Sequence, residues 1–141
     1  MAGQRPDDAQ VKHLEFVQAV IARLANDSFL MKGWALTVAG IILGFAADNL
    51  SWRMAAAAFL PVAAFWGLDA YFLRQERAFR RLYDAVRRSD PLVEPFSMDT
   101  SGMRAVVDSW WRTVLSRTLL PFYGAVVLAG LALILAGAFG R

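Results

Sequence analysis

Cysteine is absent from the 141-residue chain, and histidine occurs only once, as His13. A chain without cysteine has no disulfide, no thiolate nucleophile and no cysteine ligand for a metal. His13 has no second histidine at a helical metal-ligand spacing, and the sequence contains neither a glycine-rich phosphate loop nor a G-x-S-x-G turn. We therefore expect a protein that is not an enzyme and that holds no cofactor or metal.

Charge is also scarce. Charged residues make up 19% of the chain against 57% hydrophobic residues, and the mean hydropathy is +0.40, which is not typical of a soluble domain. Three apolar stretches, 29–47, 52–73 and 118–140, come close to the length of about 20 residues with which a helix crosses a hydrocarbon core of about 30 Å. The sequence predicts an all-α integral membrane protein, residues 1–141 forming a single membrane domain with three transmembrane helices.

The basic residues are distributed unevenly along the chain. Nine of the 15 lysines and arginines lie between the second and third apolar stretches, three precede the first, and Lys32 lies at its start. Positive charge accumulates on the cytoplasmic side of membrane proteins. This distribution predicts a cytoplasmic N-terminus, a cytoplasmic segment 74–117, and a C-terminus on the periplasmic or extracellular side.

The first cytoplasmic segment has a helical pattern. Apolar residues recur at helical spacing from Val11 to Leu24, which predicts an amphipathic helix over 10–28. This helix either packs on other cytoplasmic helices or lies in the headgroup layer. We interpret Asn26-Asp27-Ser28 as a break or a cap before the first span.

The second cytoplasmic segment is expected to extend the spans on either side of it. The helical pattern of the second span, which Pro61 can kink, continues beyond Leu73 until Pro91 and Pro95 stop it. A further helix over 103–114 leads into the third span. Together with the N-terminal helix, these extensions predict a cytoplasmic helical stalk.

Small residues recur every three or four positions in the first and third spans. They are Gly33, Gly40 and Gly44 in the first span, with Thr37 between Gly33 and Gly40, and Ala132, Ala136 and Gly140 in the third. Small side chains let helix backbones approach closely in lipid, so these faces predict a homo-oligomer. The alternative is that glycine is simply common in membrane helices.

Two ionisable residues lie near the cytoplasmic ends of neighbouring spans, Lys32 in the first and Asp69 in the second. An ionisable residue at membrane depth is costly and usually has a partner. We expect an intramembrane ion pair between Lys32 and Asp69 that clamps the two spans together. The alternative is that Asp69 belongs to an ion or proton path.

The arginines that follow the second span have two interpretations. They anchor the helix to anionic lipid headgroups, or they bind an acidic or nucleotide-like ligand with Phe79 and Tyr83 supplying stacking. No nucleic acid partner is expected. The basic cluster consists of Arg74, Arg77, Arg80, Arg81, Arg87 and Arg88.

The layout resembles small bacterial multi-span membrane proteins of the SLATT type. The resemblance rests on residues 14–29, Lys32-Gly33-Trp34, the run Phe65-Trp66-Gly67-Leu68-Asp69, and residues 77–88. It implies a bacterial inner-membrane protein that oligomerises to perturb the membrane or form a pore, in stress or phage defence, when a cytoplasmic protein partner signals. The alternative is a non-catalytic scaffold or accessory subunit of a larger membrane complex, docked through the cytoplasmic helices.

Overall fold

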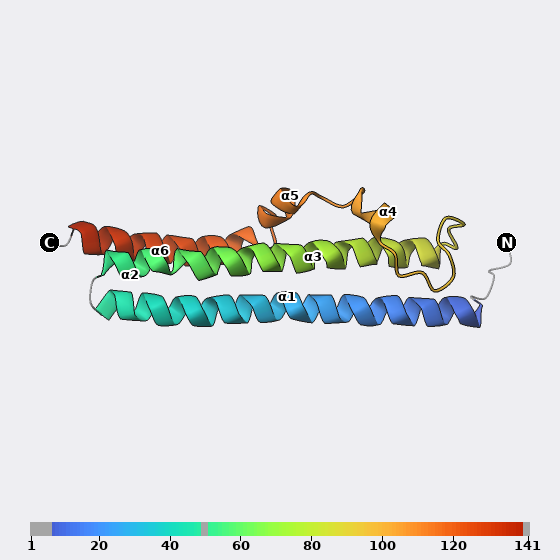
Figure 1. Ribbon diagram of the computed structural model, residues 1–141, viewed down its shortest axis with the longest axis horizontal. Coiled ribbons are helices and arrows are strands. Elements are labelled where there is room, and N and C mark those ends of the chain that lie inside the picture. Colours follow the sequence, from blue (N-terminus) through green and yellow to red (C-terminus); the bar gives the residue numbers. More distant parts are fainter. Residues whose placement is uncertain (1–6, 49–50, 140–141) are drawn as a thin grey trace.

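The computed structural model describes residues 7–48 and 51–139, and its regular structure over these residues is entirely helical. This confirms the predicted all-α class. Figure 1 shows two long antiparallel rods, α1 and the α2–α3 pair, with α6 beside them at one end only. Each of these three is long and apolar enough to cross a membrane. The helices are α1 (Asp8–Asp48), α2 (Trp52–Ala57), α3 (Phe59–Arg87), α4 (Ser101–Arg104), α5 (Trp110–Val114) and α6 (Leu120–Phe139).

The predicted break at Asn26-Asp27-Ser28 is wrong, because α1 is one continuous helix of 41 residues. No glycine or proline interrupts its sequence between Asp8 and Lys32. Ser28 does not cap a helix end but lies in the interior of the protein. At about 1.5 Å per residue α1 is about 60 Å long, twice the thickness of a hydrocarbon core.

The second rod is nearly continuous. Pro61 has no N–H with which to bond the carbonyl four residues earlier, and the helix is interrupted at Ala58, between α2 and α3. There the Ala58 N–H bonds Ala55 O at 3.2 Å, a tighter turn than that of an α-helix. Beyond the interruption α3 runs without a break to Arg87, so the predicted continuation of the second helix past Leu73 is confirmed.

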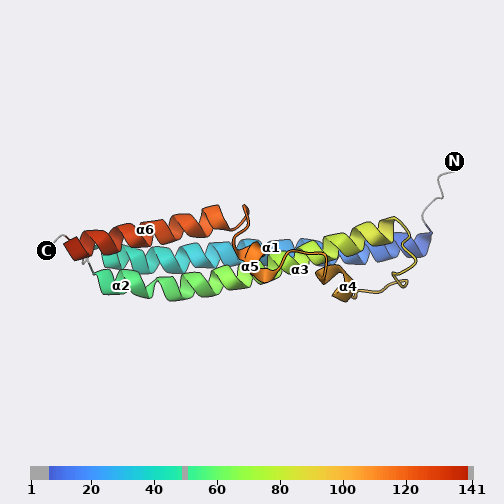
Figure 2. The same ribbon diagram turned by 90° about the horizontal axis from the view of Figure 1, so that it is seen from above.

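The segment between α3 and α6 differs from the prediction. A helix over 103–114 is expected from the sequence, but only α4 and α5 form, and residues 105–109 between them are irregular. Two contacts draw this stretch onto α3: Arg74 Nε donates to Asp108 O at 3.1 Å, and Arg77 pairs with the Asp108 carboxylate at 3.6 Å. Figures 1 and 2 show the segment folded back along α3. The single helix predicted over 103–114 is therefore wrong, and the cytoplasmic stalk stays a prediction.

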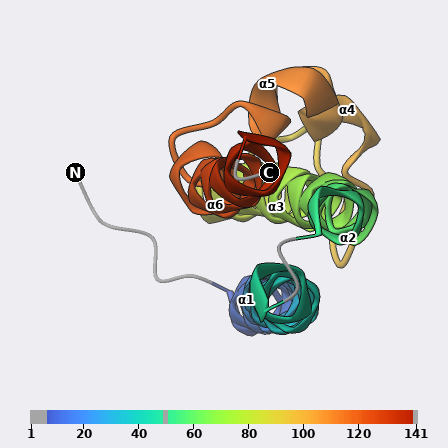
Figure 3. The same cartoon turned by 90° about the vertical axis from the view of Figure 1, so that its left-hand side faces the viewer.

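The rods pack through two apolar clusters. At the three-helix end, where α6 lies beside α2 and the first half of α3, alanine and aliphatic side chains pack around Tyr123. At the two-helix end, the halves of α1 and α3 beyond α6 meet through Val17, Leu82 and Val86. Viewed end-on, α6 and α2–α3 lie side by side with α1 across from them (Figure 3). The three-helix cluster consists of Ala35, Ala39, Val62, Ala70, Leu73, Leu119 and Tyr123.

Candidate functional site: the Asp69 cluster

The buried polar groups of the three-helix end gather around one carboxylate. Ser28 and Lys32 are four residues apart, so they lie on one face of α1; this face meets Asp69 of α3 and Tyr123 of α6. We call these four residues the Asp69 cluster. It joins all three long helices at the level where α6 begins.

Asp69 accepts three hydrogen bonds. Lys32 Nζ lies 2.7 Å from Asp69 Oδ2, and the Tyr123 hydroxyl donates to the same oxygen at 3.1 Å. The Ser28 hydroxyl donates to Asp69 Oδ1. Lys32 Nζ also donates to Ser28 Oγ at 3.0 Å, which closes the network on the α1 side. The carboxylate therefore has donors from two different helices, α1 and α6, in addition to its position on α3.

Burial makes these bonds strong and their loss costly. Asp69 and Tyr123 have no exposed surface, whereas the Lys32 side chain is 22% exposed. An ionised carboxylate out of contact with water needs both an opposite charge and hydrogen-bond donors. Lys32 supplies the opposite charge, and part of its side chain stays exposed at the surface, as is common for long basic side chains. Ser28 and Tyr123 supply the remaining donors.

Tyr123 is held in place by its neighbours on α3. Its ring stacks on Trp66 with the centroids 5.4 Å apart and the planes 5° from parallel. The Trp66 indole N–H donates in turn to Val114 O at 3.0 Å. Trp66 thus fixes both the first turn of α6 and the short α5 helix that precedes it.

The Asp69 cluster has a structural role: it holds three helices together. Proton relays in membranes are chains of Asp, Glu or His residues, and a nucleophilic site needs an activated nucleophile beside a base. Among the described residues, the groups bonded to Asp69 are one ammonium and two hydroxyls. Such a set neutralises a buried charge and fixes the register of three helices.

Two members of the cluster, Ser28 and Tyr123, are not predicted from the sequence. Ser28 stands beside Asn26 and Asp27 and therefore looks like part of a helix cap. Its spacing of four residues from Lys32 is the signal that places it on the same face. Tyr123 is a polar aromatic residue one turn inside an otherwise apolar helix, where its hydroxyl requires a partner.

The small residues predicted for oligomer contacts do not face the helix bundle. Gly33, Gly40 and Gly44 are exposed, and a Cβ added at any of them meets no described atom within 4 Å. Ala132 and Ala136 are likewise exposed, and Gly140 lies outside the described residues. The packing within the chain uses other small residues, namely Ala35, Ala39 and Ala46 of α1 and Gly130 and Gly137 of α6.

The basic cluster does not form one site. Arg74 and Arg77 bind Asp108, whereas Arg80 pairs with Glu76 at 2.6 Å. Arg87 lies 3.8 Å from Asp84 near the end of α3, and Arg88 is the exposed residue that follows. A cavity of about 250 Å³ between α3 and the irregular segment is lined by Arg77, Arg80, Arg81, Val106, Val107 and Asp108.

The chain matches no protein-family model, no curated protein and no solved structure. The resemblance to SLATT-type proteins stays a prediction.

Proposed function

We propose that this protein crosses the bacterial inner membrane three times, self-associates there, and perturbs the membrane when assembled. In this proposal the two-helix end lies in the cytoplasm, where it contacts anionic headgroups and a protein partner. The main support for self-association is that Gly33, Gly40 and Gly44 of α1 face away from the rest of the chain.

The outer surface of the three-helix end supports insertion into lipid. Large aliphatic side chains there are between 44% and 78% exposed, which suits a hydrocarbon solvent and not water. Trp52 at the start of α2 is half exposed, and Trp111 in α5 is exposed; tryptophan is enriched at both membrane interfaces. The exposed aliphatic residues are Leu36, Ile41, Leu60, Leu128, Leu131 and Leu135.

The glycines of α1 support self-association. Gly40 and Gly44 form a G-x-x-x-G pair on a face that no described part of the chain covers. In lipid, helices associate through close backbone approach and not through a hydrophobic drive. A second copy of the chain is the partner that fits this face, since it brings the same small residues.

Membrane perturbation is proposed at the level of the assembly. Within one chain the Asp69 cluster is closed by its own donors, and the apolar side chains of the three-helix cluster fill the space between the helices. A conducting path would therefore form between copies. The SLATT resemblance supports a role in stress or phage defence.

A scaffold function is the second candidate, favoured by an apolar patch at the two-helix end. Phe16 of α1 and Phe96 of the following segment are about half exposed and touch each other, with ring centroids 6.4 Å apart. Leu92 nearby in sequence is 90% exposed. Such a patch is a docking surface for a protein partner.

Topology is tested first, with single cysteines introduced into the cysteine-free chain. Asp48→Cys and Phe139→Cys should react with an impermeant maleimide in intact cells, and Leu92→Cys should react only after lysis. Labelling of Leu92→Cys in intact cells would overturn the proposed orientation.

Self-association is tested by native mass spectrometry in nanodiscs and mild detergent. Gly40→Leu should lower the oligomeric fraction because a larger side chain separates the backbones. The matched control is Gly124→Leu, another helical glycine whose added Cβ would meet no described atom within 4 Å; it should leave the oligomer unchanged. A monomeric wild-type protein would overturn the proposal.

Membrane perturbation is tested by induced expression with a potential-sensitive dye. Wild-type protein should depolarise cells, and Gly40→Leu should depolarise them less. An oligomer that leaves the potential unchanged would favour the scaffold function instead.

A further inference from the structure

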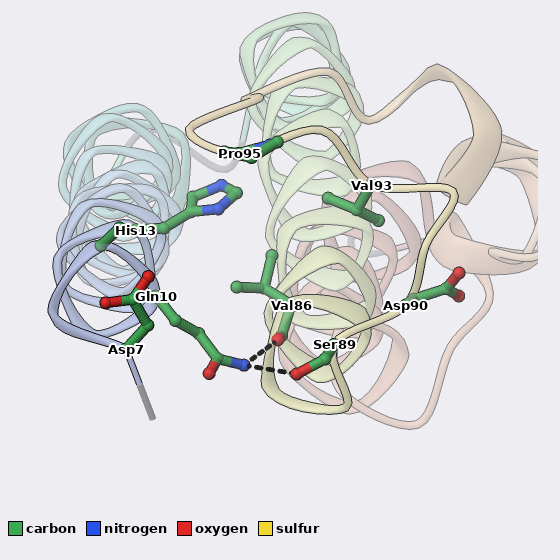
Figure 4. A pocket seen from close by; sticks show the side chains of 9 residues that line it. Asp7, Gln10, His13, Val86, Ser89, Asp90, Val93 and Pro95 are labelled. Carbon is green, nitrogen blue, oxygen red and sulfur yellow. Dashed lines mark hydrogen bonds between the residues drawn. The ribbon is translucent and has the colours of Figure 1, made fainter. Parts of the chain in front are cut away.

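His13, the one histidine of the chain, lies at the two-helix end and is only 4% exposed. Its ring projects from α1 toward the segment that follows α3 (Figure 4). Its Nε2 lies 2.7 Å from Ser97 O, and its Nδ1 lies 3.2 Å from the Phe96 backbone nitrogen. Both ring nitrogens therefore bond the backbone of one short segment, 83 or 84 residues away in the sequence.

These two partners select one form of the imidazole. The Phe96 N–H is a donor, so Nδ1 must accept and carry no proton. Ser97 O is an acceptor, so Nε2 must carry the proton. The neutral Nε2–H tautomer satisfies both contacts, whereas the imidazolium is a donor at both nitrogens. Protonation of His13 replaces the Phe96 hydrogen bond with two N–H groups that face each other.

The segment bound by His13 depends on its contacts. Phe96 has a φ of 61°, a left-handed conformation that a bulky L-residue rarely adopts. Its ring lies against the His13 ring, with centroids 5.9 Å apart. A backbone held in such a conformation persists only where its surroundings fix it. His13 supplies the hydrogen bonds that do so here.

We infer that His13 is an acid-sensitive latch that holds residues 89–98 against α1 when neutral and releases them when protonated. Histidine is the side chain that ordinarily changes charge between about pH 5 and pH 8. The latched arrangement accommodates the neutral ring alone, so acid shifts the equilibrium toward release. This device goes beyond the proposed function and does not depend on it.

Water reaches the latch through a cavity of about 290 Å³ between the start of α1 and the segment after α3 (Figure 4). Its charged lining groups are the carboxylates of Asp7 and Asp90, and α3 contributes the apolar Val86. Gln10 and Ser89 are its neutral polar groups, and they bond each other at 3.0 Å. The two carboxylates favour a cation at His13 while the segment is in place, so their charge opposes release, and the N–H groups that face each other at Phe96 must drive it.

Release has a defined consequence for the surface. Val93 packs against the cluster formed by Val17, Leu82 and Val86. When residues 89–98 leave, this part of the apolar cluster becomes exposed beside Phe16. Acid would thus present a larger docking face at the two-helix end.

The tautomer is tested first, by ¹⁵N NMR of the full chain labelled at histidine in nanodiscs. One histidine gives one pair of ring signals, so the assignment is unambiguous. Near neutral pH the spectrum should show the Nε2–H tautomer alone. An Nδ1–H tautomer or an even mixture would overturn the latch without any substitution.

Release is tested by the mobility of a nitroxide attached at Leu92→Cys, the single cysteine of the labelled chain. Between about pH 7.5 and about pH 5, where carboxylates ordinarily stay ionised, the mobile fraction should rise severalfold. His13→Asn keeps an acceptor near the Nδ1 position and does not titrate, so its spectrum should stay constant. Asp90→Asn should keep the wild-type response.

A second label, at Arg23→Cys near the middle of α1, distinguishes release from general loosening and should not respond to acid. An unchanged Leu92 spectrum in wild type, or the same change in His13→Asn, would overturn the latch. If His13→Asn fails to fold, the wild-type NMR titration still decides: the Phe96 amide signal must shift together with the His13 ring signals.

Discussion

Gly130 of α6 lies against the ring of Phe59 at the start of α3. A Cβ added to Gly130 would stand 3.1 Å from Phe59 Cζ, closer than ordinary van der Waals contact. Tyr123, Gly130 and Gly137 are the buried residues of α6, seven residues apart. Because seven residues are nearly two turns, α6 touches the other helices along one narrow seam.

Gly130→Leu should therefore loosen α6. The leucine has to displace the Phe59 ring or separate the helices, and overpacking of this kind costs about 1–3 kcal/mol. Gly130→Ala should cost less, since the ring edge needs to move only slightly. Unfolding by SDS titration measures the effect. Gly124→Leu, whose site is open, serves as the control, and equal losses in the two leucine variants would contradict the seam.

Removing either charge of the buried pair should destabilise the protein. Asp69→Ala leaves the Lys32 ammonium without its partner, and Lys32→Ala leaves a fully buried carboxylate with two hydroxyl donors only. Breaking a buried pair from one side costs about 3–5 kcal/mol, and the double variant should recover part of it.

The control for this cycle is the surface pair Lys12–Glu15, whose side chains are 64% and 56% exposed. Its cycle should give a coupling of less than about 1 kcal/mol. Purely additive effects of Lys32→Ala and Asp69→Ala would show that the two residues do not act as a pair.

Tyr123→Phe should destabilise the attachment of α6 while preserving the stack on Trp66. The variant removes one hydrogen bond to a charged acceptor, worth about 1.5–3 kcal/mol. Tyr71→Phe, at a residue that is 52% exposed, is the matched control and should be neutral. Equal unfolding midpoints for the two variants would exclude a role for the Tyr123 hydroxyl.

Asp99 gives a prediction about pH. The backbone N–H of Ser101, assisted by the Ser101 hydroxyl, holds the pKa of Asp99 below its ordinary value of 3.8. A lowered carboxyl pKa stabilises the folded turn above the ordinary value, and this contribution is lost as the pH falls through the lowered pKa. A ¹³C NMR titration should place the Asp99 transition below 3.8.

Ser101→Ala removes the hydroxyl donor but keeps the backbone N–H, so it should move the Asp99 transition only part of the way back. The charge of Arg104 contributes least to the lowered pKa of Asp99. Arg104→Gln should therefore move the Asp99 transition less than Ser101→Ala does. The reverse order would contradict the assigned cause.

The long helices could be predicted from the sequence because apolar length is a strong signal. Pro61 likewise marks the interruption at Ala58 through the N–H it lacks. The continuous course of α1 could not be predicted, since Asn26-Asp27-Ser28 has the composition of a cap and only tertiary bonds to Ser28 reveal its other use.

The inward face of each helix was harder to predict than its length. Gly40 and Ala39 are neighbours, and both belong to series of small residues at helical spacing. Periodicity alone does not say which series packs inside, because both satisfy the same spacing. The irregular stretch around Asp108 escaped prediction for a related reason: its bonds to Arg74 and Arg77 connect residues more than 30 positions apart.

Because α1 is one continuous helix of 41 residues, it can tilt as a rigid unit. Ser28 bonds it to Asp69 near its middle, and Asp8 at its first turn lies twenty residues away, or about 30 Å at about 1.5 Å per residue. A tilt of about 10° at this fulcrum displaces the far end by about 5 Å without altering the helix itself. A tilt of α1 at the two-helix end would therefore also move Gly40 and Gly44, on the other side of Ser28, because no break in the helix absorbs it.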